Sequence, residues 1–586
     1  MMTSKSLRRR SAVAVAFIAA SVMLLGARLV DLQVVRAAVL QKESVNAKSV
    51  DTTLYGSRGS IVDNTGVTLA ATVMRYDVQI SPSAAEQSAK TAGQKTLTKQ
   101  ADEIGAVTGQ GGAKILQIIQ DALKQNPDSQ YAQIINGIDA SMYDKLTALN
   151  ISWVYFTSYQ ARTYPDGAVA GNIVGFVGSS GKPQAGVELA NNSCLAGENG
   201  SETYQIGADG VTIPGSTVVQ KAAKDGGTLK LTINSDLQWF AQQQLAEVVP
   251  SLGAQFGFVT IADAKTGQLR AVAQYPSVDP NNIDATSPNY WGSLAFTTPF
   301  EPGSTFKSLT SAALIDKGLV TPTTHVLTPY EFNEDGASLH DAGYHAPEQL
   351  TLTGVLMLSS NVGMSILGQR LNDNVRYDYL KKFGIGNSTG IAFPGQSDGI
   401  LNPVNTWDAQ TKFATMFGQG VSATQMQMVS AYQALANNGV RVPLSLIEGC
   451  TLPDGKTIDT PKPQPEKVVS AKTANTVMQM LETVVTQGED SKALSIPGYQ
   501  IAAKTGTAQQ PNGQGGYYAN KYYVSVMGAV PANDPQYVVS VNIGYPTTIT
   551  SSAAAAPLFK TIMSQVIKTY RIKPSTTPAP DDPPYY

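Results

Sequence analysis

Ser304 and Lys307, in one short segment, are candidates for a nucleophile and its base. They belong to the sequence Pro-Gly-Ser-Thr-Phe-Lys over 302–307, where the Pro-Gly pair favours a turn and an apolar-periodic stretch follows, so Ser304 is predicted at a helix N-terminus. A lysine three residues further on lies one turn away on the same face, where its amine can reach the serine hydroxyl. The amine can act as a base only if its pKa falls from about 10.4, which burial and a nearby cation both favour. We expect Lys504 to be that cation.

Two further motifs carry polar groups that could complete such a site. Ser359 and Asn361 follow an apolar helical run, a buried setting in which polar side chains need partners. The segment 504–507, Lys-Thr-Gly-Thr, follows a strand-like run of small residues, and Gly506 would let a substrate backbone pass closely. Chance matches occur at 179–182, which is Ser-x-x-Lys in a predicted loop, and at 265–267, a Lys-Thr-Gly predicted to form a hairpin turn. Only their context separates the candidates from these matches.

The periodicity of the chain predicts the elements that must position these motifs. After residue 250 the sequence predicts a compact α/β domain, with strands around 256–274, 498–503 and 522–545 and helices over 304–317, 350–371, 423–437 and 470–487. Before residue 250, strand-like runs at 76–80 and 153–156 and helical windows at 113–125 and 139–149 predict an α+β pedestal. Irregular loops are expected at 276–303 and 451–468. The proline-rich segment 571–586 is typical of a disordered tail.

The N-terminus predicts a membrane anchor. A basic cluster over 5–10 precedes an uncharged apolar run from Ser11 to Ala27, and the cations favour a cytoplasmic N-terminus, with the rest of the chain outside. A cleaved signal peptide is the competing interpretation, but it would need small residues just after the run, where the chain has Arg28 and Asp31 instead. The predicted organisation is therefore a cytoplasmic end over 1–10, a transmembrane anchor over 11–33, a pedestal over 34–250, the α/β domain over 251–570 and the tail over 571–586.

Composition excludes several other classes of protein. The 586 residues carry 42 Lys and Arg against 44 Asp and Glu, a formal charge of −2 that offers no basic surface to nucleic acid. Two cysteines and three histidines leave little for a structural zinc site. His325, His340 and His345 are expected in loops or in a cleft wall. Cys194 and Cys450 fall in different predicted domains, so free thiols are expected rather than a bridge.

The motifs, taken in order, resemble the penicillin-recognising serine acyl-transfer family. The chain from the anchor to about Ile567 is similar to class B penicillin-binding proteins. It departs from the family at Asn64, where the family usually has arginine, and in the segment Tyr523–Gly528. Neither departure involves the residues of the expected chemistry. The matching segments include Arg58–Ala70, Arg162–Pro165, Gly186–Glu188, Leu195–Gly200, Phe383–Gly386, Gly418–Gly420 and Asn437–Gly439. The resemblance implies a penicillin-binding/serine β-lactamase-like α/β (α+β) transpeptidase domain on an α+β pedestal of the dimerisation type, with one transmembrane helix.

The resemblance also implies a role for each site residue. Ser304 would attack the penultimate D-Ala carbonyl of a peptidoglycan stem peptide while Lys307 takes its proton, and terminal D-Ala would leave an acyl-enzyme. The backbone N–H groups of Ser304 and Thr507 would form the oxyanion hole. Ser359 would relay the leaving-group proton, and Asn361 would hold the acyl-side amide. Lys504 would supply positive potential, while Gly506 and the hydroxyls of Thr505 and Thr507 would lie at the substrate carboxylate. No metal or organic cofactor is implied.

The partners that the resemblance implies are D-Ala-D-Ala stem peptides, β-lactams, the membrane, a SEDS-type glycosyltransferase and other division proteins, with no nucleic acid. A septal, cell-division role is favoured over an elongation role, because the pedestal and loops look compact and no long insertion follows Ser359. A hydrolytic β-lactamase or D,D-carboxypeptidase shares the motifs, but neither normally needs a pedestal of this size. A penicillin-binding sensor and a non-catalytic division scaffold are the non-enzymatic candidates, although the short segment before the anchor leaves little room for a sensor's signalling domain.

Overall fold

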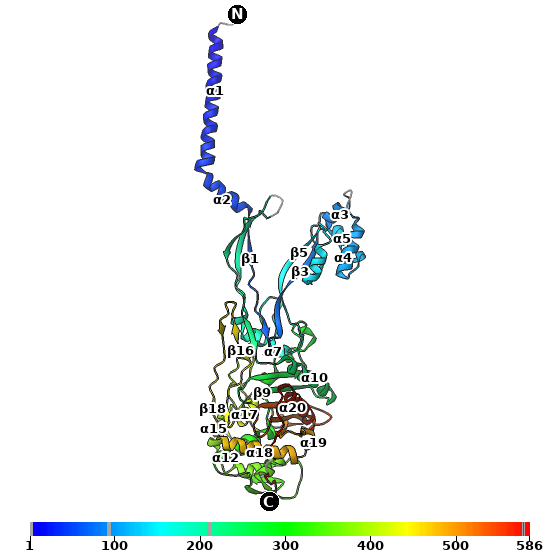
Figure 1. The fold of residues 1–586 in the computed structure, drawn as a ribbon, viewed down its shortest axis with the longest axis vertical. Coiled ribbons are helices and arrows are strands. Elements are labelled where there is room, and N and C mark those ends of the chain that lie inside the picture. Colours follow the sequence, from blue (N-terminus) through cyan, green and yellow to red (C-terminus); the bar gives the residue numbers. More distant parts are fainter. Residues whose placement is uncertain (1–3, 91–94, 208–211, 577, 579–580) are drawn as a thin grey trace. The chain divides into compact units, whose positions relative to one another are not determined.

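The structure is a computed structural model that describes residues 4–90, 95–207, 212–576, 578 and 581–586. The chain divides into two compact units (Figure 1). One unit is formed by Met1–Ser57 with Gly197–Asp225, and the other by Arg58–Ala196 with Gly226–Tyr586. Parts of the predicted cytoplasmic end (1–3) and of the predicted tail (577, 579 and 580) lie outside the described residues.

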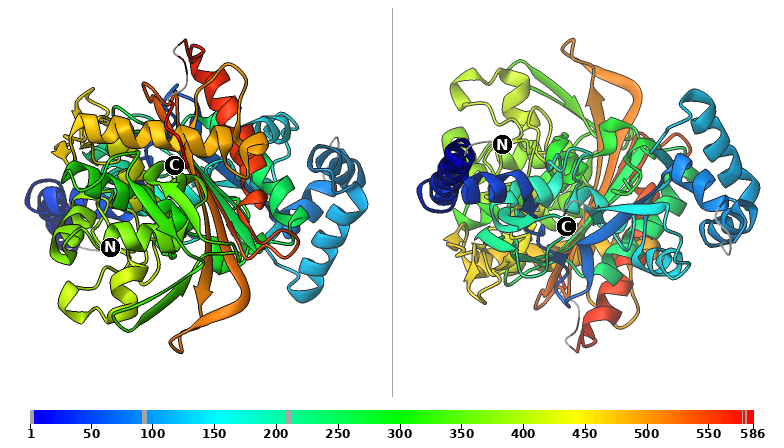
Figure 2. Two further views of the ribbon diagram at one scale, coloured as in Figure 1. Left: turned by 90° about the horizontal axis from the view of Figure 1, so that it is seen from below. Right: turned by 90° about the horizontal axis from the view of Figure 1, so that it is seen from above.

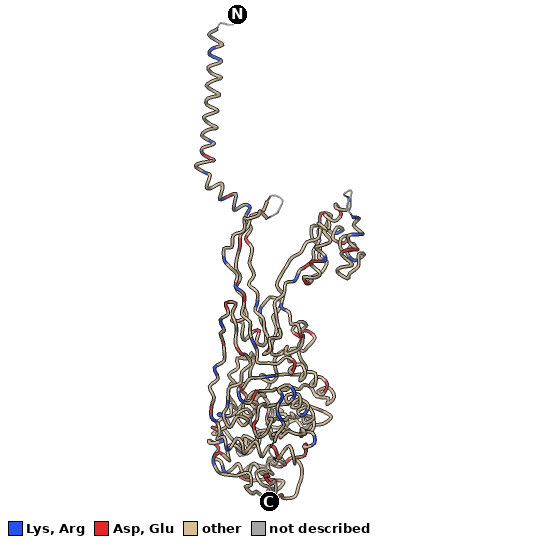
Figure 3. The backbone as a smooth tube through the Cα atoms, in the orientation of Figure 1, with Lys and Arg blue, Asp and Glu red and all other residues tan. Residues whose placement is uncertain are grey.

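The first unit contains the apolar N-terminal helix and a small sheet. Helix α1 (Ser4–Val30) runs through a π-helical segment η1 (Asp31–Val35) and is followed by α2 (Ala37–Lys48). The stretch Leu7–Val35 is long and apolar enough to cross a membrane, and the predicted anchor over 11–33 lies inside it. Basic residues gather at its N-terminal end, before a long run without charge (Figure 3). Strands β1 (Ser49–Leu54), β6 (Gly200–Gln205) and β7 (Val218–Lys221) form a three-stranded antiparallel sheet.

The second unit is built on a five-stranded antiparallel sheet, here called the catalytic sheet. Its order is β10 (Leu269–Tyr275), β9 (Phe256–Asp263), β21 (Tyr537–Gly544), β20 (Tyr517–Val530) and β19 (Ala502–Pro511). Helices α10 (Ser235–Ser251) and α20 (Ala556–Tyr570) cover one face. Successive residues of a strand point to opposite faces, so Val259 and Ile261 join that core, whereas Phe258 and Ala262 join the larger core on the other side.

The larger core holds the helices that carry or support the motifs. They are α11 (Leu294–Thr297), α12 (Lys307–Asp316), α13 (Leu352–Met357), α14 (Asn361–Gly368), α15 (Asp373–Phe383), α16 (Ala409–Ala414), α17 (Gln425–Ala436) and α18 (Ala471–Gln487). Every residue of α17 is buried, as expected for a helix that is apolar on most sides. Helix α18, gold in Figure 2, crosses close to β19 and contacts it. The short pairs β11 (His325–Thr328) with β14 (Glu348–Thr351) and β12 (Glu331–Glu334) with β13 (Ala337–His340) lie between α12 and α13 in the sequence.

A second sheet of the same unit joins residues from both predicted domains. Its order is β17 (Thr457–Ile458), β16 (Ile447–Thr451), β8 (Thr228–Leu231), β2 (Ile61–Val62), β3 (Thr68–Ile80) and β4 (Ala132–Ile138), and β5 (Val154–Thr163) also pairs with β3. Helices α3 (Pro82–Ala89), α4 (Leu97–Thr108), α5 (Gly112–Gln125) and α6 (Ala140–Thr147) pack near the far end of β3 around a core that includes the fully buried Trp153. The helical windows predicted at 113–125 and 139–149 are confirmed as α5 and α6. Between β5 and β8, α7 (Gly171–Val174), α8 (Gly186–Ala190) and α9 (Asn192–Leu195) follow in turn.

The boundary predicted after residue 250 assigns helix α10 to the pedestal. In the structure, Leu237, Leu245 and Val249 of this helix are fully buried in the core on one face of the catalytic sheet. Helix α10 packs on β9 and β10, the two strands that follow it in the sequence, and no local pattern in α10 reveals that contact. Strand β16, from the C-terminal half of the chain, pairs with β8 from the N-terminal half, so the two predicted domains also share a sheet.

The expectation of free thiols is wrong, because Cys194 and Cys450 form a disulfide. Pairing of β16 with β8 sets Cys450 opposite Leu229. The turn before β8 holds the other cysteine, since the Gly227 N–H donates to the carbonyl of Cys194 at 2.8 Å. The two sulfur atoms therefore meet although 256 residues separate them in the sequence.

The expectation of disorder is also wrong for the last residues of the tail. Tyr585 forms an antiparallel bridge with Leu350, and the Tyr586 ring stacks on His325 with 3.7 Å between centroids. Proline-rich composition predicts an extended chain but cannot reveal that a strand edge is open to it. The described end of the tail is thus part of the fold.

Candidate active site

Ser304 and Lys307 lie in the geometry that their spacing predicts. Ser304 is in a 3₁₀ turn, η4 (Gly303–Phe306), and Lys307 is the first residue of α12. The Lys307 side chain is fully buried, and its Nζ lies 2.7 Å from Ser304 Oγ. The hydroxyl and the amine are thus within hydrogen-bond distance without any rearrangement.

Carbonyl oxygens occupy the remaining positions around the amine. Lys307 Nζ donates to the backbone carbonyl of Ser359 and to Oδ1 of Asn361, each at 2.7 Å. A neutral amine has two N–H bonds and one lone pair. If both N–H bonds go to these acceptors, the lone pair is left facing the Ser304 hydroxyl, which is the arrangement a general base requires.

The electrostatics favour that neutral form. Burial lowers the pKa of Lys307 well below 10.5, the positive charge of Lys504 lowers it further, and the Asp341 carboxylate acts in the opposite direction. Burial also lowers the pKa of Lys504, to about 7, against the opposing influence of Asp490. Lys504 thus lies close enough to Lys307 for its positive charge to lower the pKa of that amine.

Ser359 occupies a break between two helices. The helix predicted over 350–371 is wrong as one element, because α13 ends at Met357 and α14 begins at Asn361. Ser359 has φ +61°, a left-handed conformation that is costly for a residue with a side chain. That turn aims its carbonyl at Lys307, while its Oγ accepts from Lys504 Nζ at 2.9 Å. Ser359 thus links the two lysines.

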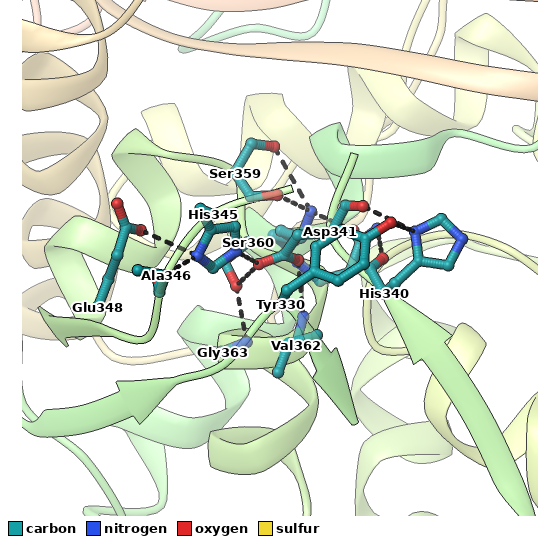
Figure 4. A network of polar contacts seen from close by, with 12 residues as sticks. Tyr330, His340, Asp341, His345, Ala346, Glu348, Ser359, Ser360, Val362 and Gly363 are labelled. Atoms are coloured by element: carbon teal, nitrogen blue, oxygen red, sulfur yellow. Dashed lines mark hydrogen bonds and ion pairs between the residues drawn. The ribbon is translucent and has the colours of Figure 1, made fainter. Parts of the chain in front are cut away.

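Asp341, which the motifs did not reveal, holds this turn in place (Figure 4). Its Oδ1 accepts from the backbone N–H groups of Asn361 and Val362, and its Oδ2 accepts from Ser360 Oγ at 2.6 Å. Ser360 is itself the N-cap of α14, accepting from the Gly363 N–H at 2.8 Å. A carboxylate at a helix N-terminus is favourable, so Asp341 stabilises the start of α14 directly behind Ser359.

His345 lies against the far side of the same carboxylate. Its Nε2 is 3.1 Å from Asp341 Oδ2, and its Nδ1 is 2.8 Å from the carbonyl of Ala346 and 3.8 Å from Glu348. Burial opposes, but these oxygens and carboxylates outweigh it and raise the pKa of His345. The only signal for Asp341 in the sequence is its position, since it directly follows His340, precedes His345 by four residues and lies between the first two motifs.

The third motif lies on β19, the edge strand of the catalytic sheet. Lys504 is fully buried, and Thr505 and Thr507 open into the cleft. A Cβ at Gly506 would lie 2.5 Å from Ser525 Oγ and 3.2 Å from the carbonyl oxygen of Pro302. The glycine therefore lets β19 approach the turn that carries Ser304.

All three motifs open onto one cleft of about 710 Å³. Ser304, Ser359, Asn361, Thr505 and Thr507 line it. His340 and His345 also line it, as expected for cleft-wall residues, whereas His325 stacks on Tyr586. Of the two chance matches, the one at 179–182 lies in the loop between α7 and α8, and the one at 265–267 forms the hairpin between β9 and β10.

Comparison with known proteins agrees with this geometry. A family model described as the penicillin binding protein transpeptidase domain matches residues 257–564, and one described as the penicillin-binding protein dimerisation domain matches residues 53–231. Penicillin-binding protein PbpB of Mycobacterium tuberculosis (strain ATCC 25618 / H37Rv) is 34% identical over 576 residues, which cover 94% of this chain and 84% of that protein. Peptidoglycan D,D-transpeptidase FtsI of Escherichia coli (strain K12) is 28% identical over 554 residues, covering 93% and 89%.

Solved structures extend the similarity to three dimensions. The crystal structure of penicillin binding protein 3 from Mycobacterium tuberculosis, complexed with ampicillin, has a TM-score of 0.71 and 30% sequence identity. The match covers 91% of this chain and all of that one. A peptidoglycan synthetase from Bifidobacterium adolescentis gives a TM-score of 0.71 at 27% identity, covering 92% of this chain.

Proposed function

The chain belongs to the class B penicillin-binding proteins, the peptidoglycan D,D-transpeptidases, and from this premise we propose that it cross-links stem peptides during septal wall synthesis through an acyl-enzyme on Ser304. One observation carries the assignment of the nucleophile and base. Two carbonyl acceptors stand ready for the N–H bonds of Lys307, so its lone pair faces Ser304 Oγ.

In the proposed acylation, Ser304 Oγ attacks the carbonyl carbon between the last two D-Ala residues, and its proton passes to Lys307 Nζ. The backbone N–H groups of Ser304 and Thr507 stabilise the oxyanion. The C–N bond then breaks, and the departing amine of D-Ala takes a proton that Lys307 supplies through Ser359 Oγ, which lies 3.5 Å from its Nζ. The product is an ester on Ser304 plus free D-Ala, so the atoms and protons balance.

Binding and transfer use the other side of the cleft. The hydroxyls of Thr505 and Thr507 donate to the terminal carboxylate, and the Lys504 cation beside them favours its negative charge. Asn361 presents its amide to the acyl side. An amine of a second stem peptide then attacks the ester, Lys307 takes one of its protons, and Ser304 Oγ leaves with a proton to restore the starting state.

Labelling of the full chain in detergent with a fluorescent penicillin tests this assignment. We expect a covalent adduct that persists for minutes and disappears in Ser304→Ala. Ser179→Ala is the matched control, because it removes the serine of the chance Ser-x-x-Lys match in an exposed loop, and it should label like the wild type. Rapid loss of the adduct with hydrolysis of the drug would favour a β-lactamase, and no adduct at all would favour a scaffold without chemistry.

Two observations support the septal role. Relatives that cover most of the chain carry the FtsI and PbpB names, and the structure places only the short helix α14 directly after Ser359, not a long insertion. Depletion of the protein in its host should yield cells that elongate without forming septa. Cells that round up while still dividing would assign the chain to the elongation type instead.

We infer that α1 lies in the membrane and that the second unit, which carries the active site, lies outside the cytoplasm. We also infer that a multi-pass SEDS-type polymerase binds the anchor and the pedestal. The apolar stretch Leu7–Val35 supports the first part. Purification from detergent with a tag on the chain should recover such a polymerase, and a version in which residues 7–35 are replaced by an unrelated transmembrane helix should recover less of it.

A further inference from the structure

The last four residues of the chain bind along a free edge of β14 as an extra strand. The Thr351 N–H donates to the carbonyl of Pro584 at 3.0 Å, and its Oγ1 donates to the carbonyl of Pro583 at 2.7 Å. The Tyr586 N–H donates to the carbonyl of Gln349 at 3.3 Å. Strand β11 pairs with the other edge of β14, so the tail completes a three-stranded arrangement.

The groove matches the chemistry of its occupant. Proline has no N–H, so a Pro-Pro pair can offer only carbonyl acceptors, and Thr351 supplies two donors to them from one residue. A Cβ on Gly354 would overlap with the carbonyl oxygen of Pro584, and all three of the atoms nearest to that position belong to Pro584. The absence of a side chain at Gly354 is therefore what admits the tail.

The aromatic ring of Tyr586 makes the contact at the other end of the tail. The Tyr586 ring lies parallel to His325 of β11, with 3.7 Å between centroids and 4° between planes. His325 is the residue opposite Thr351 in the β11–β14 pair. The tail thus contacts both strands of the pair, by hydrogen bonds to one and by ring stacking on the other.

The groove is joined to the active site through one short helix. Thr351 is the N-cap of α13, and its Oγ1 accepts from the Gly354 N–H at 3.2 Å while it donates to Pro583. The carbonyl of Gly354 accepts from the Leu358 N–H at 2.9 Å, and that of Val355 accepts from the Ser360 N–H at 3.0 Å. The tail therefore binds the first turn of a helix whose last bonds hold the residues on either side of Ser359.

We propose that the edge of β14 and the first turn of α13 form a binding site for an extended Pro-Pro-aromatic-aromatic peptide, which this chain fills with its own residues 583–586, and that its occupation positions the Ser359–Asn361 turn for acylation. Only the expected effect of tail binding on the rate of acylation rests on the proposed function. The binding itself rests on the contacts of Thr351, Gly354 and His325.

Three variants of the full chain in detergent test the proposal: a chain ending at Asp582, Gly354→Ala, and the two combined. Hydrogen exchange over 348–354 reports binding of the tail, and the rate of labelling by a fluorescent penicillin reports the positioning of the turn. We expect the shortened chain to lose protection at Thr351 and to be labelled about 2-fold to 30-fold more slowly, the range typical of coupling through a neighbouring element. Gly354→Ala should do the same with the tail present, and add nothing when the tail is absent.

Rescue separates positioning from a simple loss of stability. The synthetic peptide Asp-Asp-Pro-Pro-Tyr-Tyr, added to the shortened chain, should restore both the protection and the labelling rate. The same residues in the order Tyr-Pro-Asp-Tyr-Pro-Asp should not, and neither peptide should rescue the combined variant, in which the alanine fills the place of Pro584.

Four results would overturn the proposal in whole or in part. Unchanged protection in the shortened chain would show that the tail does not bind β14. Lost protection with an unchanged labelling rate would refute the positioning role, and so would failure of the matching peptide to rescue. Protection that rises with protein concentration would assign the site to the tail of a second copy. If the full chain takes no penicillin at all, the proposed function fails, but hydrogen exchange still decides the binding.

Discussion

At the scale of single residues, the chemistry depends on Lys307, which is fully buried and forms no ion pair with any residue that the structure describes. Nζ of Lys307 contacts two carbonyl oxygens and two hydroxyls, and the Asp341 carboxylate is engaged by the backbone of α14 instead. A buried cation with no ion-pair partner is unfavourable, so the site stabilises the neutral amine. Three of these four contacts come from the Ser359–Asn361 turn, so the turn positions the amine of Lys307 directly.

This arrangement predicts how acylation depends on pH. Because the pKa of Lys307 is lowered well below 10.5, its amine becomes neutral, and able to act as a base, at a lower pH than an ordinary lysine, whereas Lys504, with its pKa lowered to about 7, loses its charge as the pH rises further. The labelling rate should therefore rise from acidic pH, reach a maximum near neutrality and fall above about pH 7 as the potential for the substrate carboxylate is lost. Labelling between pH 5 and 10 measures this, and a rate that climbs steadily to pH 10 would contradict a neutral Lys307.

A second residue-scale prediction concerns Asn361→Asp. A carboxylate 2.7 Å from Nζ would raise the pKa of Lys307, because the charged amine gains a direct partner. A rise of about 1–3 pKa units would move the ascending part of the pH profile upward by the same amount, and at a pH below this ascending part it would slow labelling about 10- to 1,000-fold. Asn361→Ser is the control, since it removes the acceptor without adding charge. It should slow labelling without moving the profile, and an equal shift in both variants would refute the electrostatic explanation.

The sequence predicted those site residues whose relation is local or whose motif is distinctive. Ser304 and Lys307 are one helical turn apart, so their contact could be expected from spacing alone. Asp341 could not be predicted in the same way. Its role depends on the return of the chain from β13 to the start of α14, and nothing around residue 341 indicates which helix its carboxylate will meet.

At the scale of elements, the break between α13 and α14 explains why a continuous apolar pattern was misleading. The periodicity over 350–371 is that of a buried helix, but it carries no information on φ at Ser359. The break is held by partners from distant parts of the chain, namely Lys307, Asp341 and Lys504. Helices without such a break, such as α17 and α18, were predicted to within two residues of their observed bounds.

The disulfide between α9 and β16 carries a prediction at this scale. It ties elements 256 residues apart, so its reduction should free a long loop in the unfolded chain and lower the free energy of unfolding by about 2–5 kcal/mol. Thermal melting of the full chain in detergent, with and without a reductant, measures the effect. The cysteines lie outside the cleft, so penicillin labelling at low temperature should survive reduction. The double variant Cys194→Ser with Cys450→Ser should have the same melting temperature as the wild type with its disulfide reduced, and the reductant should not change that temperature.

At the scale of the whole molecule, the two compact units differ in how much of their structure could be predicted from the sequence. The catalytic sheet order β10-β9-β21-β20-β19 sets strands from both ends of the domain side by side, and α10, which precedes β9 in the sequence, packs on one face of that sheet. The apolar N-terminal helix depends on length and composition rather than on a tertiary partner. Its stretch of 29 residues, at about 1.5 Å each, exceeds the roughly 30 Å of a bilayer's hydrocarbon core, which is why composition alone sufficed to predict a helix long and apolar enough to cross a membrane.

The orientation of that anchor is the prediction that tests the molecule as a whole. Basic residues at 5 and 8–10 favour retention of the N-terminus in the cytoplasm, so the first unit's sheet and the whole second unit should lie outside. In spheroplasts, a membrane-impermeant maleimide should label Gln220→Cys, on the exposed strand β7, but label Ser4→Cys only after permeabilisation. The native cysteines are joined in a disulfide and do not compete for the reagent. Labelling of Ser4→Cys in intact spheroplasts would reverse the orientation. A mature chain that has lost residue 4 and is released from membranes by carbonate would establish a cleaved signal peptide instead.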